Sequence, residues 1–131
     1  MARHESNFLQ KISMIAIVDD DAAVRQATQS FLRSLDYHVY TFGSANEYLK
    51  SENVHDTSCV ITDLHMPGLS GLDLQDQLIA RGHHIPIIFI TGYPDDIARA
   101  RAMKAGAVCF LSKPYNQDHL LGYLDQALKA A

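Results

Sequence analysis

The fold is indicated most clearly by one stretch of the sequence, Val60-Ile61-Thr62-Asp63-Leu64-His65-Met66-Pro67-Gly68. Apolar residues, a polar interruption and then Pro-Gly are typical of a buried strand that runs into a turn, with Asp63 at its tip. Ligands of open α/β sheets bind at the carboxyl ends of the strands, so Asp63 is a candidate site residue. Asp is also favoured in turns for local backbone hydrogen bonds, and this stretch alone leaves that interpretation open.

The composition is that of an ordinary globular chain of one-domain length. Its 131 residues are 47% hydrophobic and 20% charged, with a formal net charge of −4. Direct nucleic-acid binding is not expected, because phosphate contacts need clustered Lys and Arg. No apolar stretch approaches the ~20 residues that cross a membrane, and the N-terminus lacks a signal peptide's apolar stretch. We expect a flexible leader at 1–12, one domain at 13–131, and a cytoplasmic location without membrane contact.

The apolar periodicity predicts five strands, each followed by a helix. The expected strands are 14–18, 38–42, 59–62 ending at Asp63, 85–90 and 107–111. The expected helices are 22–35, 44–50, 70–82, 95–105 and 116–129, with 51–58 as a loop. The first helix carries its apolar residues at Ala23, Val24, Ala27, Phe31 and Leu35. Such an alternation predicts an α/β fold, a doubly wound parallel sheet with helices on both faces.

The cysteines and histidines give no metal or redox motif. Cys59 and Cys109 lie on predicted strands without CxxC or metal-ligand spacing, which is typical of small buried side chains. The seven histidines are scattered, and none forms the i, i+4 pair of a helical zinc site.

Polar residues follow several predicted strands and therefore gather at one edge of a parallel sheet. These residues are Asp19, Asp20, Asp63, Thr91, Ser112 and Lys113, with Pro114 next in the chain. Crowded carboxylates repel one another unless a cation intervenes, and Mg²⁺ prefers such oxygen ligands. Lys113 can neutralise Asp63 or hold an anionic group placed on it, while Thr91 and the backbone of Gly92 can bond a phosphoryl oxygen. This set of groups indicates phosphoryl transfer to an aspartate.

The segments IVDDD, VITDLHMPGLSGLDL, IIFITG and AVCFLSKP, in that order and spacing, resemble the response-regulator receiver domains of two-component signalling. The resemblance to this CheY-like family covers residues 14–129, and the run ITGYPDD…AMKAGAVCFLSKPY is most similar to FixJ-like receivers. It implies a flavodoxin-like (βα)5 fold with strand order 2-1-3-4-5.

The resemblance also implies a role for each matching residue. Asp63 would accept the phosphoryl group, and Mg²⁺ (or Mn²⁺) would be bound by Asp19, Asp20, Asp63 and the backbone carbonyl of His65. Asp20 would be the more direct ligand, with Asp19 acting largely through water. The phosphate-binding and switch residues would be Thr91, Gly92, Lys113 and Phe110, with a cis peptide bond before Pro114. His65 after Asp63-Leu64 and Tyr115 after Lys113-Pro114 depart from the commoner pattern of the family.

The implied partner is a sensor histidine kinase or a phosphotransfer protein that donates the phosphoryl group. The face formed by helix 95–105, strand 107–111 and helix 116–129 would then serve a homodimer or an output domain. A helix-turn-helix output domain is absent from these 131 residues. On this interpretation the chain is a switch rather than an enzyme.

Two other classes of protein, a phosphohydrolase and a flavin-binding protein, share parts of this pattern. A Mg²⁺-dependent phosphohydrolase with Asp63 as nucleophile usually has a second acid two residues later, where this chain has His65. No substrate-covering insertion follows. A flavin-binding protein is disfavoured because three carboxylates after the first strand would repel the cofactor phosphate.

Overall fold

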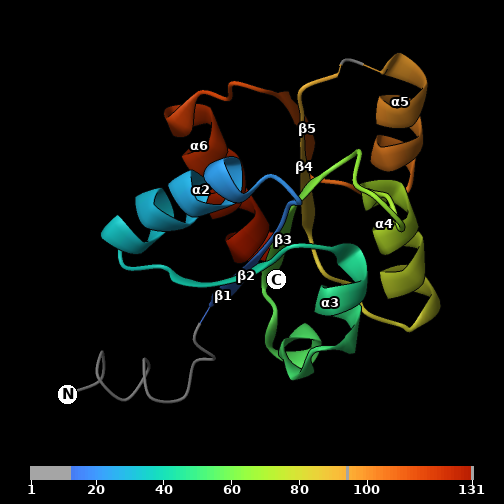
Figure 1. Ribbon diagram of the computed structural model, residues 1–131, viewed down its shortest axis with the longest axis horizontal. Coiled ribbons are helices and arrows are strands. Elements are labelled where there is room, and N and C mark those ends of the chain that lie inside the picture. Colours follow the sequence, from blue (N-terminus) through green and yellow to red (C-terminus); the bar gives the residue numbers. More distant parts are fainter. Residues whose placement is uncertain (1–12, 94, 131) are drawn as a thin grey trace.

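A five-stranded parallel sheet in the order β2-β1-β3-β4-β5 forms the centre of the computed structural model, which describes residues 13–93 and 95–130 (Figure 1). The leader predicted at 1–12 lies outside these described residues. The strands are β1 (Met14–Val18), β2 (His38–Phe42), β3 (Cys59–Asp63), β4 (Ile87–Thr91) and β5 (Cys109–Ser112). Every neighbouring pair is parallel. The predicted fold class and strand order are therefore confirmed.

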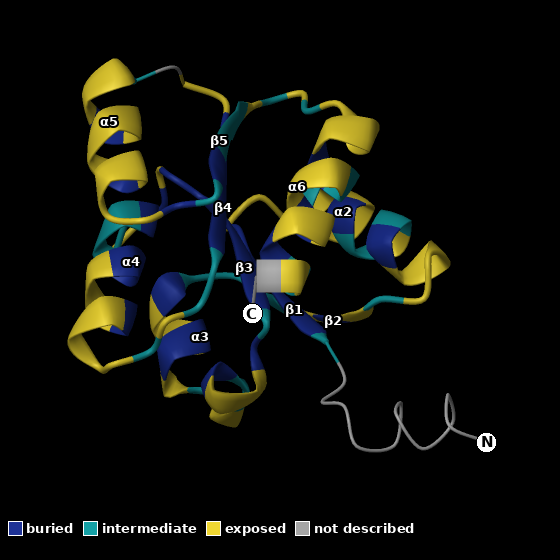
Figure 2. Ribbon diagram, turned by 180° about the vertical axis from the view of Figure 1, so that it is seen from behind, coloured by how far each residue is buried: buried dark blue, intermediate teal, exposed yellow. Residues whose placement is uncertain are grey.

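Helices cover both faces of this sheet. On one face lie α2 (Ala22–Ser34) and α6 (Gln117–Ala130), and on the other lie α3 (Ala45–Lys50), α4 (Gly71–Ala80) and α5 (Asp96–Lys104). Figure 2 shows that the helices turn their buried sides to the sheet and their exposed sides to solvent. Both faces of the sheet are thus covered, which explains why every residue of β1, β3 and β4 is buried.

The core consists of two apolar layers, one on each face of the sheet. Ile15, Ile61 and Ile88 pack with α2 and α6, whereas Val60 and Phe89 pack with α3, α4 and α5. Successive side chains of a strand point to opposite faces, so neighbouring residues of one strand belong to different layers. Cys59 and Cys109 are free and buried in the first of these layers, as predicted for small apolar side chains.

Side-chain caps begin the helices directly after the strands. Asp21 accepts hydrogen bonds from the first turn of α2, and Asp95 does the same for α5. Ser70 and Asp73 form a reciprocal capping box at α4. These caps satisfy N–H groups that have no partner within the helix and thereby fix the loops at the carboxyl edge of the sheet.

The structure corrects the predicted bounds of two strands and the description of one loop. Strand β4 begins at Ile87, because Pro86 has no N–H to donate, and it includes Thr91. Strand β5 begins at Cys109, since the N–H of Ala107 bonds to the carbonyl of Ala102 at the end of α5. The predicted loop at 51–58 contains a 3₁₀ helix, Glu52–Asp56, capped by the Ser51 side chain.

The buried face of α2 also differs from the prediction. Ala23, Ala27 and Leu35 are exposed, and the buried residues of the helix are Thr28 and Leu32. A polar residue can occupy the inward face because the Thr28 hydroxyl has a hydrogen-bonding partner in a distant part of the chain. Periodicity of apolar residues alone could not reveal this.

Gly71 is the point at which α4 packs against the end of β3. A Cβ atom there would lie 2.3 Å from the backbone oxygen of Asp63 and 3.1 Å from the Phe89 ring. We predict that Gly71→Ala lowers the free energy of unfolding by about 1–3 kcal/mol, measured by urea denaturation.

Gly122 in α6 provides the matched control, because a Cβ there would meet nothing within 4 Å. Gly122→Ala should raise the free energy of unfolding by roughly 0.5–1 kcal/mol through helix propensity. A Gly71→Ala protein as stable as the wild type would contradict the close packing of α4 on β3.

Candidate functional site

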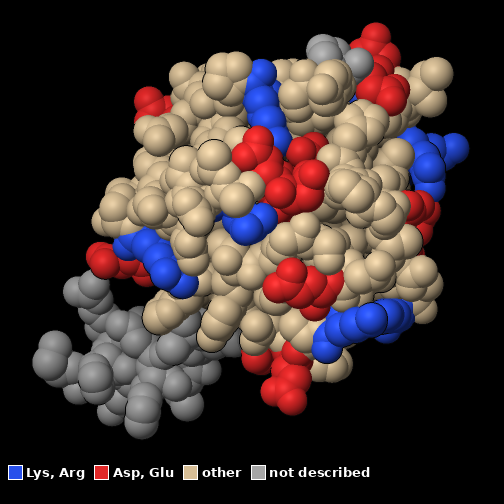
Figure 3. Space-filling view, in the orientation of Figure 1, with Lys and Arg blue, Asp and Glu red and all other residues tan. Residues whose placement is uncertain are grey.

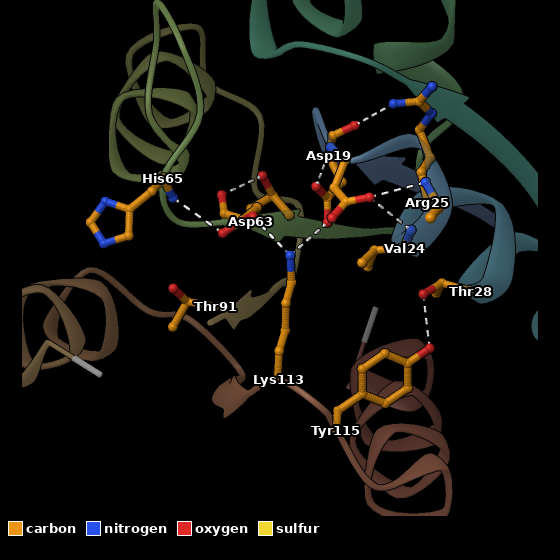
Figure 4. Close-up of polar contacts among 12 residues, drawn as sticks. Asp19, Val24, Arg25, Thr28, Asp63, His65, Thr91, Lys113 and Tyr115 are labelled. Carbon is orange, nitrogen blue, oxygen red and sulfur yellow. Dashed lines mark hydrogen bonds and ion pairs between the residues drawn. The ribbon is translucent and has the colours of Figure 1, made fainter. Parts of the chain in front are cut away.

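Asp19, Asp63 and Lys113 meet at the carboxyl edge of the sheet (Figure 4). The Lys113 ammonium Nζ lies 2.9 Å from Oδ2 of Asp63 and 3.2 Å from Oδ2 of Asp19. The side chain of Asp19 is only 6% exposed, that of Asp63 is 11% exposed and that of Lys113 is 20% exposed. Residues that are 50 and 94 positions apart in sequence thus form one ion-paired cluster.

The two oxygens of each carboxylate have different partners. Oδ1 of Asp19 accepts the N–H of Asp21 at 2.9 Å, and Oδ1 of Asp63 accepts the N–H of His65 at 3.2 Å. In both residues Oδ2 contacts Lys113. Asp63 therefore stabilises its own turn through one oxygen and contacts Lys113 through the other. The local hydrogen bond expected of a turn Asp is present, and the role of Asp63 as a site residue stays a prediction.

Asp20 completes an acidic cluster at this edge. One oxygen each of Asp19, Asp20 and Asp63 lies within 4.8 Å of the others, and Asp20 is the exposed member. Hard divalent cations prefer carboxylate oxygens, so this donor set fits Mg²⁺. Figure 3 shows an acidic patch on this face of the molecule, with basic side chains beside it. The structure places His65 next to the cluster through its N–H, and the role of its carbonyl stays a prediction.

Burial and neighbouring charges both shift the pKa of Asp19 and of Lys113. Burial has the larger effect on Asp19, whereas the paired carboxylates have the larger combined effect on Lys113. Burial raises the pKa of Asp19 above its ordinary value of 3.8, and this outweighs the lowering by the Asp21 N–H and by Lys113. Burial alone would lower the pKa of Lys113, but the hydrogen bond to Asp63 and the charge of Asp19 raise it above 10.5. The lysine is therefore charged at neutral pH, while Asp19 carries an unfavourable desolvation.

The remaining predicted residues surround this cluster. Thr91 is fully buried at the end of β4, and its hydroxyl accepts the N–H of Tyr93 at 3.1 Å. Gly92 is exposed in the turn that follows. Phe110 is half-buried on β5, with its ring 5.9 Å from that of Phe89. The Lys113–Pro114 peptide bond is cis.

Three contacts near the site were not predicted. Arg25 Nη1 donates to the backbone carbonyl of Asp19 at 2.6 Å. The rings of His65 and Tyr93 lie edge to face with centroids 5.8 Å apart, which joins the loops after β3 and β4. The third is the hydrogen bond between Thr28 and Tyr115. Of these three contacts, only that of Arg25 could have been anticipated from neighbouring residues, because Arg25 lies one helical turn beyond the Asp21 cap.

A family model for the response regulator receiver domain matches residues 15–125, and the chain belongs to this family. Among its relatives is the response regulator protein TodT of Pseudomonas putida, which is 45% identical over 129 residues, or 98% of this chain and 56% of TodT. The structure of response regulator StyR has a TM-score of 0.84 and 41% identity, and the match covers 90% of this chain and 60% of that chain. The crystal structure of FixJ-N has a TM-score of 0.83 and 31% identity, covering 93% and 98%.

Membership of this family defines the chain as a phospho-accepting receiver domain of two-component signalling and does not favour the phosphohydrolase alternative. The family is one of signalling domains rather than of enzymes. The chain spans about half the length of the curated relatives it matches. FixJ is one of several relatives, so the comparisons support the wider family without singling out the FixJ-like subgroup. Within the described residues, no helix has the length and apolar character that a membrane span requires.

The pKa of Asp19 gives a prediction for stability in metal-free buffer. A carboxyl whose folded-state pKa lies above its unfolded value contributes its full stability below pH 3.8 and loses it as the pH rises through the folded-state pKa. Asn does not titrate and can still accept the Asp21 N–H. We expect Asp19→Asn to raise the free energy of unfolding at pH 7 by roughly 0.5–2 kcal/mol.

This gain should shrink as the pH falls towards 3.8, and urea denaturation at several pH values would show it. The raised pKa of Lys113 does not affect this pH dependence, because the stability that it contributes is lost only as the pH rises above 10.5. Asp56→Asn, at an exposed carboxylate, is the control. A less stable Asp19→Asn protein at pH 7 would show that pairing, not burial, dominates this site.

Proposed function

We propose that Asp63 is the phosphoryl acceptor of this receiver domain and that a histidine kinase or a phosphotransfer protein is the donor. The observation that carries the proposal is the arrangement of Asp63, which is buried, ion-paired to Lys113 and adjacent to two further carboxylates. An acceptor needs an ionised oxygen that is accessible to phosphorus and a cation that stabilises the added charge. Oδ2 of Asp63 and the ammonium of Lys113 supply these two features.

In the proposed reaction, Asp63 Oδ2 attacks phosphorus and forms an acyl phosphate. The P–N bond of the donor phosphohistidine breaks, and the imidazole keeps that electron pair and takes up a proton. The His65 N–H continues to hold Oδ1, so the carboxylate keeps its orientation. Lys113 moves from pairing two carboxylates to pairing the phosphoryl oxygens, which is a short displacement for a flexible ammonium.

Asp19, Asp20 and Asp63, with the His65 carbonyl, would hold Mg²⁺ (or Mn²⁺) beside the acceptor. When bound, this cation neutralises charge on the carboxylates and on the transferred group. The support is the close approach of three oxygens from these aspartates. Among the described residues, these three carboxylates have a single lysine as ion-pairing partner, which contacts Asp19 and Asp63. They therefore have an excess of negative charge, which a divalent cation would balance.

We further propose that Thr91 and Phe110 carry the signal to the face formed by α5, β5 and α6. The Thr91 hydroxyl accepts the Tyr93 N–H and donates to the Tyr93 carbonyl at 3.4 Å. Donating to a phosphoryl oxygen instead would break the bond to that carbonyl, in the loop that leads to α5. Inward movement of Thr91 leaves room for the Phe110 ring to turn. An output domain and a cytoplasmic location also stay predictions, the former in line with FixJ, a transcriptional regulatory protein.

The first test is phosphoryl incorporation from acetyl phosphate with Mg²⁺, followed by intact-mass spectrometry. The wild type should gain one phosphoryl group, and Asp63→Asn should gain none, because an amide is not a nucleophile towards phosphorus. Asp96→Asn, at an exposed carboxylate of α5, should behave like the wild type. Equal incorporation into the Asp63→Asn protein would remove Asp63 from its assigned role.

The second test concerns homodimerisation through the exposed surface of α5. Ile97 is 84% exposed and Met103 is 40% exposed on this helix, and Arg101 pairs with Asp76 of α4 at the surface. Apolar side chains among mixed charges suit a two-fold self-complementary contact. Beryllofluoride, an unreactive mimic of the phosphoryl group, should shift the wild type to a dimer in sedimentation experiments.

Ile97→Glu should weaken this self-association by about tenfold or more, because it places a charge in the apolar part of the contact. Leu35→Glu is the matched control, since Leu35 is also exposed but lies at the end of α2 on the other face of the sheet. A mass that does not change with concentration, with and without the mimic, would argue against the dimer.

A further inference from the structure

A hydrogen bond joins Tyr115 to Thr28 beside the cluster of Asp19, Asp63 and Lys113. The Tyr115 hydroxyl lies 2.8 Å from Oγ1 of Thr28, across 87 residues of sequence (Figure 4). Thr28 is 2% exposed on the inward side of α2. Tyr115 is half-buried and comes two residues after Lys113. Neither Thr28 nor Tyr115 has a role in the proposed phosphoryl transfer described above.

The bond anchors one side of the segment that carries Lys113. On the other side, the Lys113 N–H donates to the backbone carbonyl of Thr91 at 2.7 Å. The lysine therefore lies between a backbone anchor on β4 and a side-chain anchor on α2. A groove of about 380 Å³, lined in part by Val24 and Pro114, lies between α2 and this segment. Tyr115 also packs against the apolar layer that includes Leu32 of α2, so its ring and its hydroxyl both contact that side of the fold.

Helix α2 is itself fixed to the acidic loop. Asp21 caps the helix, and its N–H bonds to Oδ1 of Asp19. Arg25 of the same helix donates to the Asp19 backbone carbonyl. The bond from Thr28 to Tyr115 therefore connects the element that positions the Asp19 carboxylate to the segment that positions the Lys113 ammonium. Together with the ion pair, it closes a ring of contacts around the site.

We infer that Tyr115 is a positioning residue, whose bond to Thr28 holds the Lys113 ammonium close to Asp19 and Asp63. This inference deepens the proposed function and rests on it. The ammonium and a divalent cation compete for the same carboxylates. A looser lysine therefore leaves the carboxylates more open to Mg²⁺, but it is less well placed to stabilise phosphoryl oxygens.

The test uses Tyr115→Phe, Thr28→Val and the double variant. Calorimetric titration should show Mg²⁺ binding about threefold tighter in each single variant, while phosphorylation by acetyl phosphate at saturating Mg²⁺ becomes about threefold or more slower. The double variant should match the single variants, because all three lack the same bond. Thr28→Ser keeps a hydroxyl and should restore wild-type values.

Tyr40→Phe, at an exposed tyrosine of β2, is the control and should change neither quantity. Opposite changes in Mg²⁺ affinity and rate distinguish positioning from a loss of folding, which would weaken both. Unchanged or weaker Mg²⁺ binding in Tyr115→Phe overturns the inference. Failure of Asp63 to accept phosphate would refute the proposed function separately, with the Mg²⁺ titration still deciding the role of Tyr115.

Discussion

The Lys113 ammonium lies between the carboxylates of Asp19 and Asp63, and the geometry of the sheet determines why a lysine is required there. Strands β3 and β5 are separated by β4, so their backbones lie roughly 10 Å apart. Only a long side chain after β5 can cross that distance to reach Asp63. Lys113 does so and also contacts Asp19 at the end of β1. The ion pairs thus connect the ends of three strands at one edge of the sheet.

This cluster is arranged for change rather than for maximal stability. Burial disfavours the ionised Asp19, and a single lysine serves two carboxylates. Functional sites commonly hold such unfavourable groups, with the rest of the fold compensating for them. Here the compensation comes from the apolar layers on both faces of the sheet and from the capped helices that follow β1 and β3. The contact between the rings of His65 and Tyr93 links the turn after Asp63 to the segment that leads to α5.

The gathering of Asp19, Asp20, Asp63 and Lys113 is predicted from the residues that follow each strand, whereas the strand order is predicted only through the resemblance to receiver domains. Parallel strands bring their carboxyl ends to one edge, whatever the details of packing. The inward position of Thr28 was not predictable in this way. Its burial depends on a hydroxyl 87 residues away, and apolar periodicity assigns a polar residue to the exposed face. The start of β4 was likewise misplaced because an apolar run does not show which residues can donate to the sheet.

Chemical trapping of the acyl phosphate would show directly which aspartate accepts the phosphoryl group. After incubation with acetyl phosphate and Mg²⁺, sodium borohydride would reduce a phosphoaspartate to homoserine, and tandem mass spectrometry of peptides would locate it. We expect homoserine at position 63 and unmodified aspartate at positions 19 and 20. Homoserine at either of those positions, or at none of the aspartates, would contradict the assignment of the site.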